Sequence, residues 1–258
     1  MRIARIGLTP LKGARHVRQE SVTLTPDGPV GDRLFCLVDP ARGRVVRTVQ
    51  NPALMQTVAR WEGGVLRVEL PGRTVEGTPM PTGEVLKVDY WGRTAAVEVC
   101  AGPWAGAFAA HLGYDVVLAR AVHSGEVVYG APVSLVTTSS LRVLSERLGR
   151  DVAGARFRAT FVVDTGDTAP SGVAGRLVED AWVGRELRLG EATVRVRGPI
   201  ARCAVMDLEP RTGVRDAAVL GAVAGYRQQQ GEIDFGVDAV VTAPGRARTG
   251  DRVELGRG

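Results

Sequence analysis

The chain has 258 residues, enough for one large β-rich unit or two small domains. Hydrophobic residues make up 45% and charged residues 24%, a balance typical of folded soluble proteins that argues against extended disorder. The net charge is +5, and all but two of the 33 basic residues are arginines, which are scattered rather than grouped into runs. This distribution argues against a nucleic-acid partner and fits a small anionic ligand, which needs only a few clustered guanidinium groups.

The three cysteines, Cys36, Cys100 and Cys203, lie far apart in the sequence and form no Cys-x-x-Cys pair. That spacing argues against a disulfide framework and against a cysteine-rich zinc or iron–sulfur site. The first residues lack the apolar stretch of a signal peptide, and no segment has the length and hydrophobicity of a membrane span. We therefore expect a cytoplasmic protein that does not bind membranes.

Short strands separated by turns are predicted for the first hundred residues. They are Val17–Thr25, Arg33–Val38, Val45–Thr48, Val65–Leu70, Val85–Val88 and Thr94–Val99. Several short strands at this spacing are typical of a small barrel or sandwich. A helix is predicted over Pro103–Leu112, with Gly113 as its stop. We place a domain boundary near residue 120, which separates a first domain of residues 1–120 from a second of residues 121–258.

The second half is predicted to mix strands with peripheral helices, so the fold class is β-rich α+β. A helix is predicted over Ser139–Leu148, where Thr138 can cap the start and Gly149 can end it, and another around Ala217–Arg227. The Pro/Gly-rich segment Thr165–Gly175 predicts a mobile surface loop. The predicted strands are Val133–Val136, Phe161–Val163, Arg185–Leu189, Thr193–Arg197, Val237–Thr242 and Val253–Leu255, of which the third and fourth form a hairpin.

The pair Arg202-Cys203 points most directly to chemistry, because it lies at the end of a predicted strand and just before a turn sequence. A neighbouring guanidinium favours the thiolate, which can ligate a metal or act as a nucleophile. The local sequence alone favours a buried structural cysteine, since free cysteine is among the most buried residue types. Cys36 and Cys100 lie in apolar runs and are predicted to be core residues.

Candidate anion ligands are Lys12, Arg33, Arg156, Arg158 and Arg202. Taken singly, each is more often a solvated surface charge. Lys12 stands out because lysine is rare in this chain and because it follows the first strand in a Pro-Leu-Lys-Gly loop. Motifs of zinc peptidases, serine hydrolases, P-loop enzymes and dinucleotide-binding proteins are absent from the sequence.

Several segments together, in one order and at characteristic spacings, carry a resemblance to a known family. They are Pro10–Gly13, Gly31–Val38, Leu141–Leu148, Arg156–Val163, Glu179–Trp182 and Arg202-Cys203 leading into Glu209–Gly213. The second half resembles the MOSC domain, which is named after the C-terminal part of molybdenum cofactor sulfurase. The first half resembles the β-barrel domain that precedes it, and the architecture is similar to that of the mitochondrial amidoxime-reducing component and its bacterial relatives.

The resemblance implies an N-terminal β-barrel-like domain followed by a MOSC β-barrel domain with peripheral helices. In the family, the cysteine that matches Cys203 ligates molybdenum beside the pterin dithiolene of the molybdenum cofactor (Mo-molybdopterin). The residues that match Lys12, Arg33, Arg158 and Arg202 hold the pterin and its phosphate. Thr160 stands where amidoxime reducers have asparagine and is expected to bind the cofactor too, and Gly13 stands where they tend to have serine. A groove between the two domains is the expected pocket.

The function that the resemblance implies is reduction of N-hydroxylated small molecules by oxygen-atom transfer, with Cys203 as the catalytic metal ligand. The sequence shows no flavin, haem or iron–sulfur motif, so a separate electron-donor protein is expected as a partner. Two alternatives stay open. The chain could carry sulfur or the cofactor through a Cys203 persulfide, or it could be a repurposed domain that has lost the metal.

Overall fold

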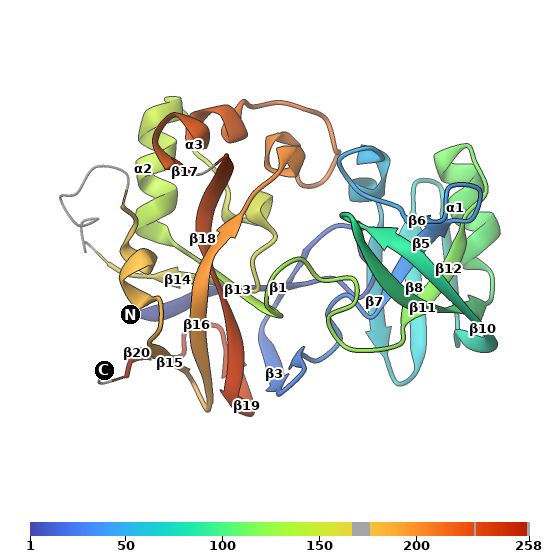
Figure 1. Ribbon diagram of the computed structural model, residues 1–258, viewed down its shortest axis with the longest axis horizontal. Coiled ribbons are helices and arrows are strands. Elements are labelled where there is room, and N and C mark those ends of the chain that lie inside the picture. The colour runs from blue at the N-terminus through green and yellow to red at the C-terminus, as the bar shows by residue number, and fades with distance from the viewer. Residues whose placement is uncertain (167–175, 230, 257–258) are drawn as a thin grey trace.

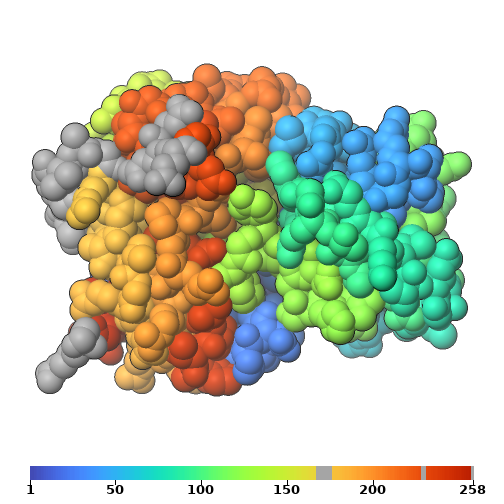
Figure 2. Space-filling view, in the orientation of Figure 1, coloured from blue at the N-terminus to red at the C-terminus, as the bar shows by residue number. Residues whose placement is uncertain are grey.

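The computed structural model of the chain describes residues 1–166, 176–229 and 231–256. They form two lobes that meet at a seam (Figure 1). The connecting segment, residues 122–132 between strands β12 and β13, is coloured lime and lies between the lobes in the space-filling view (Figure 2). Most of the loop predicted over Thr165–Gly175 lies outside the described residues. None of the helices in the described part of the chain is long and apolar enough to cross a membrane.

The larger lobe is built on a long sheet. In spatial order its strands are β2 (Val17–Gln19), β1 (Arg2–Leu8), β14 (Phe161–Asp164), β13 (Val133–Thr137), β18 (Glu232–Ala243), β16 (Ala192–Ala201), β15 (Glu186–Leu189) and β20 (Val253–Leu255), and β17 (Gln228–Gln229) pairs with β18. Phe161, Val162 and Val163 of β14 are all buried, as their unbroken apolar run predicts for a strand that is covered on both faces. The predicted hairpin is confirmed as β15–β16.

Helices α2 (Thr138–Leu148) and α3 (Val219–Arg227) pack on the larger lobe (Figure 1). The predicted cap of α2 was wrong by one residue. Thr137 has extended backbone, and its hydroxyl accepts a hydrogen bond from the Ser140 N–H at 3.1 Å, whereas Thr138 is already helical. Gly149 ends the helix in the left-handed conformation, as predicted.

The smaller lobe contains a closed barrel. Its strands are β10 (Met80–Tyr90), β11 (Arg93–Ala101), β12 (Val117–Ala121), β5 (Phe35–Asp39) and β6 (Arg44–Val45). Beside it lie a sheet of β7 (Val58–Glu62), β8 (Val65–Leu70) and β9 (Arg73–Gly77) and the helix α1 (Trp104–Leu112), which confirms the helix predicted before Gly113. The strand predicted over Val45–Thr48 is shorter than expected, because only its first residue pairs in β6.

The N-terminal strands tie the two halves of the sequence together. β1 pairs with β14 of the second half, and β3 (Ser21–Thr25) pairs with both β4 (Gly28–Pro29) and β19 (Gly245–Arg248). The strand predicted over Val17–Thr25 is divided at Glu20 into β2 and β3, which join different sheets. By strand pairing, β1 to β4 therefore belong with the larger lobe, whereas Leu11 between β1 and β2 pairs with Phe35 of β5 in the smaller lobe. The boundary near residue 120 stays a prediction.

Four short 3-10 helices in the described residues complete the chain. They are η1 (Pro52–Gln56), η2 (Gly154–Phe157), η3 (Val178–Trp182) and η4 (Ala204–Asp207). Two of them position the site described next, because η2 ends at Arg158 and η4 begins directly after Cys203.

Candidate functional site

Cys203 lies where β16 has ended and η4 begins. Its side chain is half-buried and lines a cavity of about 340 Å³ at the seam between the lobes. The other two cysteines lie inside the smaller lobe, where burial raises the pKa of the Cys36 thiol to about 12 and also raises the pKa of Cys100. Both are core residues, as predicted, so Cys203 is the cysteine that has access to the cavity.

Both lobes and the segment between them form the walls of this cavity. The wall residues that carry charged, polar or aromatic groups are Lys12, Arg33, Arg47, Thr48, Tyr90, Trp91, Tyr129, Ser134, Phe157, Arg158, Arg202, Cys203 and Glu232. The structure thus brings Cys203 together with four of the residues expected to bind the cofactor, although they come from four separate segments of the sequence. The seam is the place where the groove was expected.

The side chains of Arg33 and Arg158 are each held by a backbone carbonyl of another segment. Both residues adopt the left-handed conformation, with φ of 48° and 51°, which is uncommon outside glycine and concentrates at functional sites. Arg33 pairs with the carboxylate of Asp32, and its Nη2 donates to the Arg158 carbonyl at 3.1 Å. Arg158 in turn donates from Nη2 to the Ala14 carbonyl at 2.7 Å. Each of the two guanidinium groups is therefore held in place by a hydrogen bond to a backbone carbonyl, although their like charges repel.

Arg158 and Arg202 each keep one buried nitrogen free of protein acceptors. Arg202 donates from Nε to the Phe235 carbonyl at 2.7 Å and from Nη1 to the Phe157 carbonyl at 2.9 Å. Arg158 Nη1 and Arg202 Nη2 are buried and have no hydrogen-bond partner among the described residues. Burial lowers the pKa of both groups to about 10, and at Arg158 the neighbouring Arg33 adds to the effect. Both still carry a positive charge at neutral pH.

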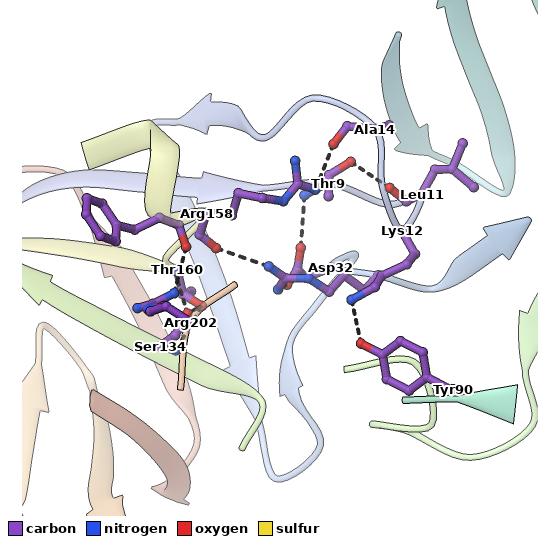
Figure 3. Close-up of polar contacts among 12 residues, drawn as sticks. Thr9, Leu11, Lys12, Ala14, Asp32, Tyr90, Ser134, Arg158, Thr160 and Arg202 are labelled. Atoms are coloured by element: carbon purple, nitrogen blue, oxygen red, sulfur yellow. Dashed lines mark hydrogen bonds and ion pairs between the residues drawn. The ribbon is translucent and has the colours of Figure 1, made fainter. Parts of the chain in front are cut away.

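Lys12 and Tyr90 contact each other at the wall of the cavity. Its Nζ donates to the Tyr90 hydroxyl at 2.6 Å (Figure 3). Burial, followed by repulsion from Arg33 and Arg158, lowers the pKa of Lys12 to about 7. Burial raises the pKa of Tyr90 to about 12, so the phenol stays protonated. Near neutral pH the lysine can therefore gain or lose its charge in response to a ligand.

The cavity combines a cluster of positively charged side chains with the thiol of Cys203. Lys12, Arg33, Arg158 and Arg202 line it, and Asp32 is the carboxylate paired with one of them. A buried guanidinium donor without an acceptor costs on the order of 1–3 kcal/mol, and an anionic ligand with several acceptor oxygens would remove that cost. The donor set therefore fits a small anion with a second group placed at the sulfur.

Comparison with known families agrees with this two-lobed arrangement. Residues 1–103 match the MOSC N-terminal beta barrel domain, and residues 114–254 match the MOSC domain. The chain belongs to the MOSC domain family. The expected resemblance and the β-rich α+β fold class are both confirmed.

Individual relatives of this MOSC protein cover only parts of it. The molybdenum cofactor sulfurases of Drosophila mojavensis and Drosophila grimshawi are 31% and 34% identical over 111 residues, which is 43% of this chain and 13% of each relative. Among solved structures, the YUAD protein of Bacillus subtilis aligns over 98% of this chain and 94% of its own, with 10% identity and a TM-score of 0.47. YiiM of Geobacillus stearothermophilus aligns over 49% of this chain and 55% of its own, with 18% identity and a TM-score of 0.32.

Two predicted residues of the MOSC domain do not line the cavity. Thr160 is fully buried behind Ser134, whose hydroxyl accepts the Thr160 N–H at 3.1 Å and whose own N–H donates to the Thr160 hydroxyl at 3.2 Å. Ser134 lines the cavity and Thr160 supports it. Arg156, a candidate anion ligand, points away and donates to the Leu208 carbonyl at 3.0 Å and to Asp216 at 2.7 Å. That candidate was wrong, because its charge is already used within the fold.

The sequence did not single out several wall residues, among them Tyr90, Trp91 and Tyr129. The residues Trp91-Gly92 between two alternating runs could have indicated a tight hairpin turn, which would have placed Tyr90 and Trp91 together at a strand end. No comparable signal marks Tyr129, which lies outside the helices and strands between the two lobes.

Proposed function

We propose that this MOSC protein binds the molybdenum cofactor in the seam cavity, with the Cys203 thiolate as the protein ligand of the metal, and that it reduces N-hydroxylated small molecules. The observation that carries the proposal is the shared cavity: the accessible sulfur of Cys203 and the buried donors of Arg158 and Arg202 line the same walls. The name of the curated relatives, molybdenum cofactor sulfurase, points to the same cofactor.

The residues present fit such a group. The soft sulfur of Cys203 is the type of ligand that thiophilic metals prefer. The orphaned donors of Arg158 and Arg202, together with Arg33 and Lys12, match a pterin phosphate and the acceptor atoms of a pterin ring. A cavity of about 340 Å³ falls in the usual range for small-molecule and cofactor sites.

When bound, the cofactor supplies the two-electron chemistry of oxygen-atom transfer. The protein residues hold and orient the ligands around it. The guanidinium groups of Arg33 and Arg158 are held by the backbone carbonyls of Arg158 and Ala14, so little rearrangement is needed when an anion enters. Lys12 holds or releases a proton at Nζ near neutral pH, and the Tyr90 hydroxyl keeps that nitrogen at the cavity wall. Conversion of N–OH to N–H with release of water consumes two electrons and two protons, and we propose a separate electron-donor protein as the source of the electrons.

A second candidate function is a carrier of sulfur or of the cofactor, through a persulfide on Cys203. The position of Cys203, half-buried at the wall of the cavity, favours this candidate, because a terminal sulfur on it would face the cavity, where a partner protein could accept it. The two functions differ in what the purified protein contains, so one set of measurements separates them.

The experiment is elemental analysis with mass spectrometry of the protein purified from a host that makes the cofactor. We expect about one molybdenum per chain in the wild type and a large loss in Cys203→Ala. Cys100→Ala is the matched control, because Cys100 is buried in the smaller lobe and should leave the metal content unchanged. A persulfide on Cys203 without molybdenum would favour the carrier. Equal metal content in wild type and Cys203→Ala would overturn the assignment of the ligand.

A further inference from the structure

Two exposed aromatic side chains stand at the wall of the cavity. Trp91 and Tyr129 are 42% and 43% exposed, and both line the cavity that contains Cys203. Their ring centroids are 6.0 Å apart with an interplanar angle of 61°, an edge-to-face pair, and their exposed fractions show that part of each side chain is still open to a ligand. Arg47 stacks on Trp91 with its guanidinium carbon 4.6 Å from the ring centroid. The apolar side chains of Val49 and Val128 line the same cavity.

The backbone of Trp91 is held in a conformation that its side chain disfavours. Trp91 and Gly92 form the two-residue turn between β10 and β11, with φ of 57° and 79°. Turns with two positive φ angles strongly prefer Asn-Gly or Asp-Gly, and a bulky residue at positive φ is an outlier. Asparagine or glycine at position 91 would form the same turn with less strain. Strained backbone conformations of this kind concentrate at functional sites, and Trp91 lies at a cavity wall.

The two aromatic residues are anchored relative to each other. Arg93, directly after the turn, donates from Nη2 to the carbonyls of Gly125 and Val128 at 3.2 and 2.6 Å, which ties the connecting segment to the hairpin. On the other side of Tyr129, the Ala131 N–H donates to Asp238 of β18 at 2.7 Å. The pair therefore sits on fixed supports from both lobes, and little ordering is needed when a ligand binds it.

We propose that Trp91 and Tyr129 form a subsite for a planar aromatic or heteroaromatic ring of the substrate. Stacking on the exposed ring surface would hold such a ring at the wall while its polar substituent extends toward the Cys203 side of the cavity. The identity of that substituent as an N-hydroxylated group rests on the proposed function. The ring subsite itself is tested independently of the metal.

The test compares benzamide with cyclohexanecarboxamide, two probes that share the carboxamide and differ in a planar against a saturated six-membered ring. Their affinities for the purified protein are measured by titration calorimetry. Stacking of one aromatic ring predicts that benzamide binds about three- to tenfold more tightly. Trp91→Asn should abolish this preference while its thermal unfolding midpoint stays equal to that of the wild type or rises, because asparagine tolerates the turn conformation.

Two further variants complete the design. Tyr129→Leu should reduce the preference for benzamide, and Trp61→Phe, a half-buried tryptophan outside the cavity wall, should keep it. Equal binding of both probes to the wild type, or an unchanged preference in Trp91→Asn, would overturn the inference. The preference should persist in Cys203→Ala. A wild type that holds no molybdenum but prefers benzamide would contradict the proposed function and leave the ring subsite standing.

Discussion

Lys12 should make anion binding to the cavity depend on pH in the neutral range. Its pKa of about 7 means that the charged fraction falls from about 0.9 at pH 6 to about 0.1 at pH 8. A bound anion favours the charged lysine, so binding takes up a proton, and affinity is full below pH 7 and is lost as pH rises through it. If the anion requires the charged form, its dissociation constant rises about tenfold between pH 6 and pH 8, or about 1.4 kcal/mol.

Sulfate is a suitable probe, because its own charge does not change in this range. His16, Tyr90, Arg158 and Arg202 also keep their protonation states in this range. Burial lowers the pKa of His16 well below its usual value, so this imidazole stays neutral. Burial raises the pKa of Tyr90 to about 12, and the pKa values of Arg158 and Arg202 remain near 10. Titration calorimetry at several pH values between 6 and 8 should therefore isolate the lysine.

Three variants decide the assignment. Lys12→Met should bind sulfate more weakly at pH 6 and show no tenfold change up to pH 8. Lys12→Arg should keep the affinity and lose the pH dependence, because a guanidinium stays charged. Cys203→Ser should keep the wild-type slope, which excludes titration of the thiol as its source. A tenfold slope that survives in Lys12→Met, or a flat profile in the wild type, would refute the reasoning.

Two further predictions concern the supports of the site. Gly213→Ala should lower the free energy of unfolding, measured in urea, by more than Gly149→Ala does. Both glycines have positive φ, so the backbone strain of the added Cβ is similar. At Gly213, however, the Cβ would lie 2.2 Å from the Pro52 carbonyl oxygen, whereas the space beside Gly149 is open. Equal losses would show that this contact between the lobes is not tight. Thr160→Val should lower the free energy of unfolding by about 1–3 kcal/mol in the same assay, because it leaves the buried Ser134 N–H without the Thr160 hydroxyl as acceptor. Thr160→Ser keeps a hydroxyl and should lower it by less. Equal losses in the two variants would contradict a supporting role for the hydroxyl.

Much of the local structure could be predicted because it depends on neighbouring residues. The buried part of β14, Phe161–Val163, follows from an unbroken apolar run, and the end of α2 follows from Gly149, which adopts positive φ without strain. Strand partners could not be predicted in this way. β1 (Arg2–Leu8) pairs with β14 across more than half of the chain, and no local pattern specifies a partner at that distance.

In the candidate site, too, some features follow from the sequence and others only from the tertiary structure. The sequence by itself determined which residues could carry chemistry, above all Cys203 and the scarce Lys12. The family resemblance, which rests on the order of several segments, added the expected role of each. Residue type and local sequence could not separate Arg156 from Arg158, which lie two positions apart and carry the same charge. The family resemblance named Arg158, and only the tertiary structure shows why. The left-handed backbone at Arg158 sends its side chain to the cavity, while Arg156 is held within the fold by Asp216, a partner 60 residues away. Which arginine is free to bind a ligand depends on contacts that form only when distant segments pack together.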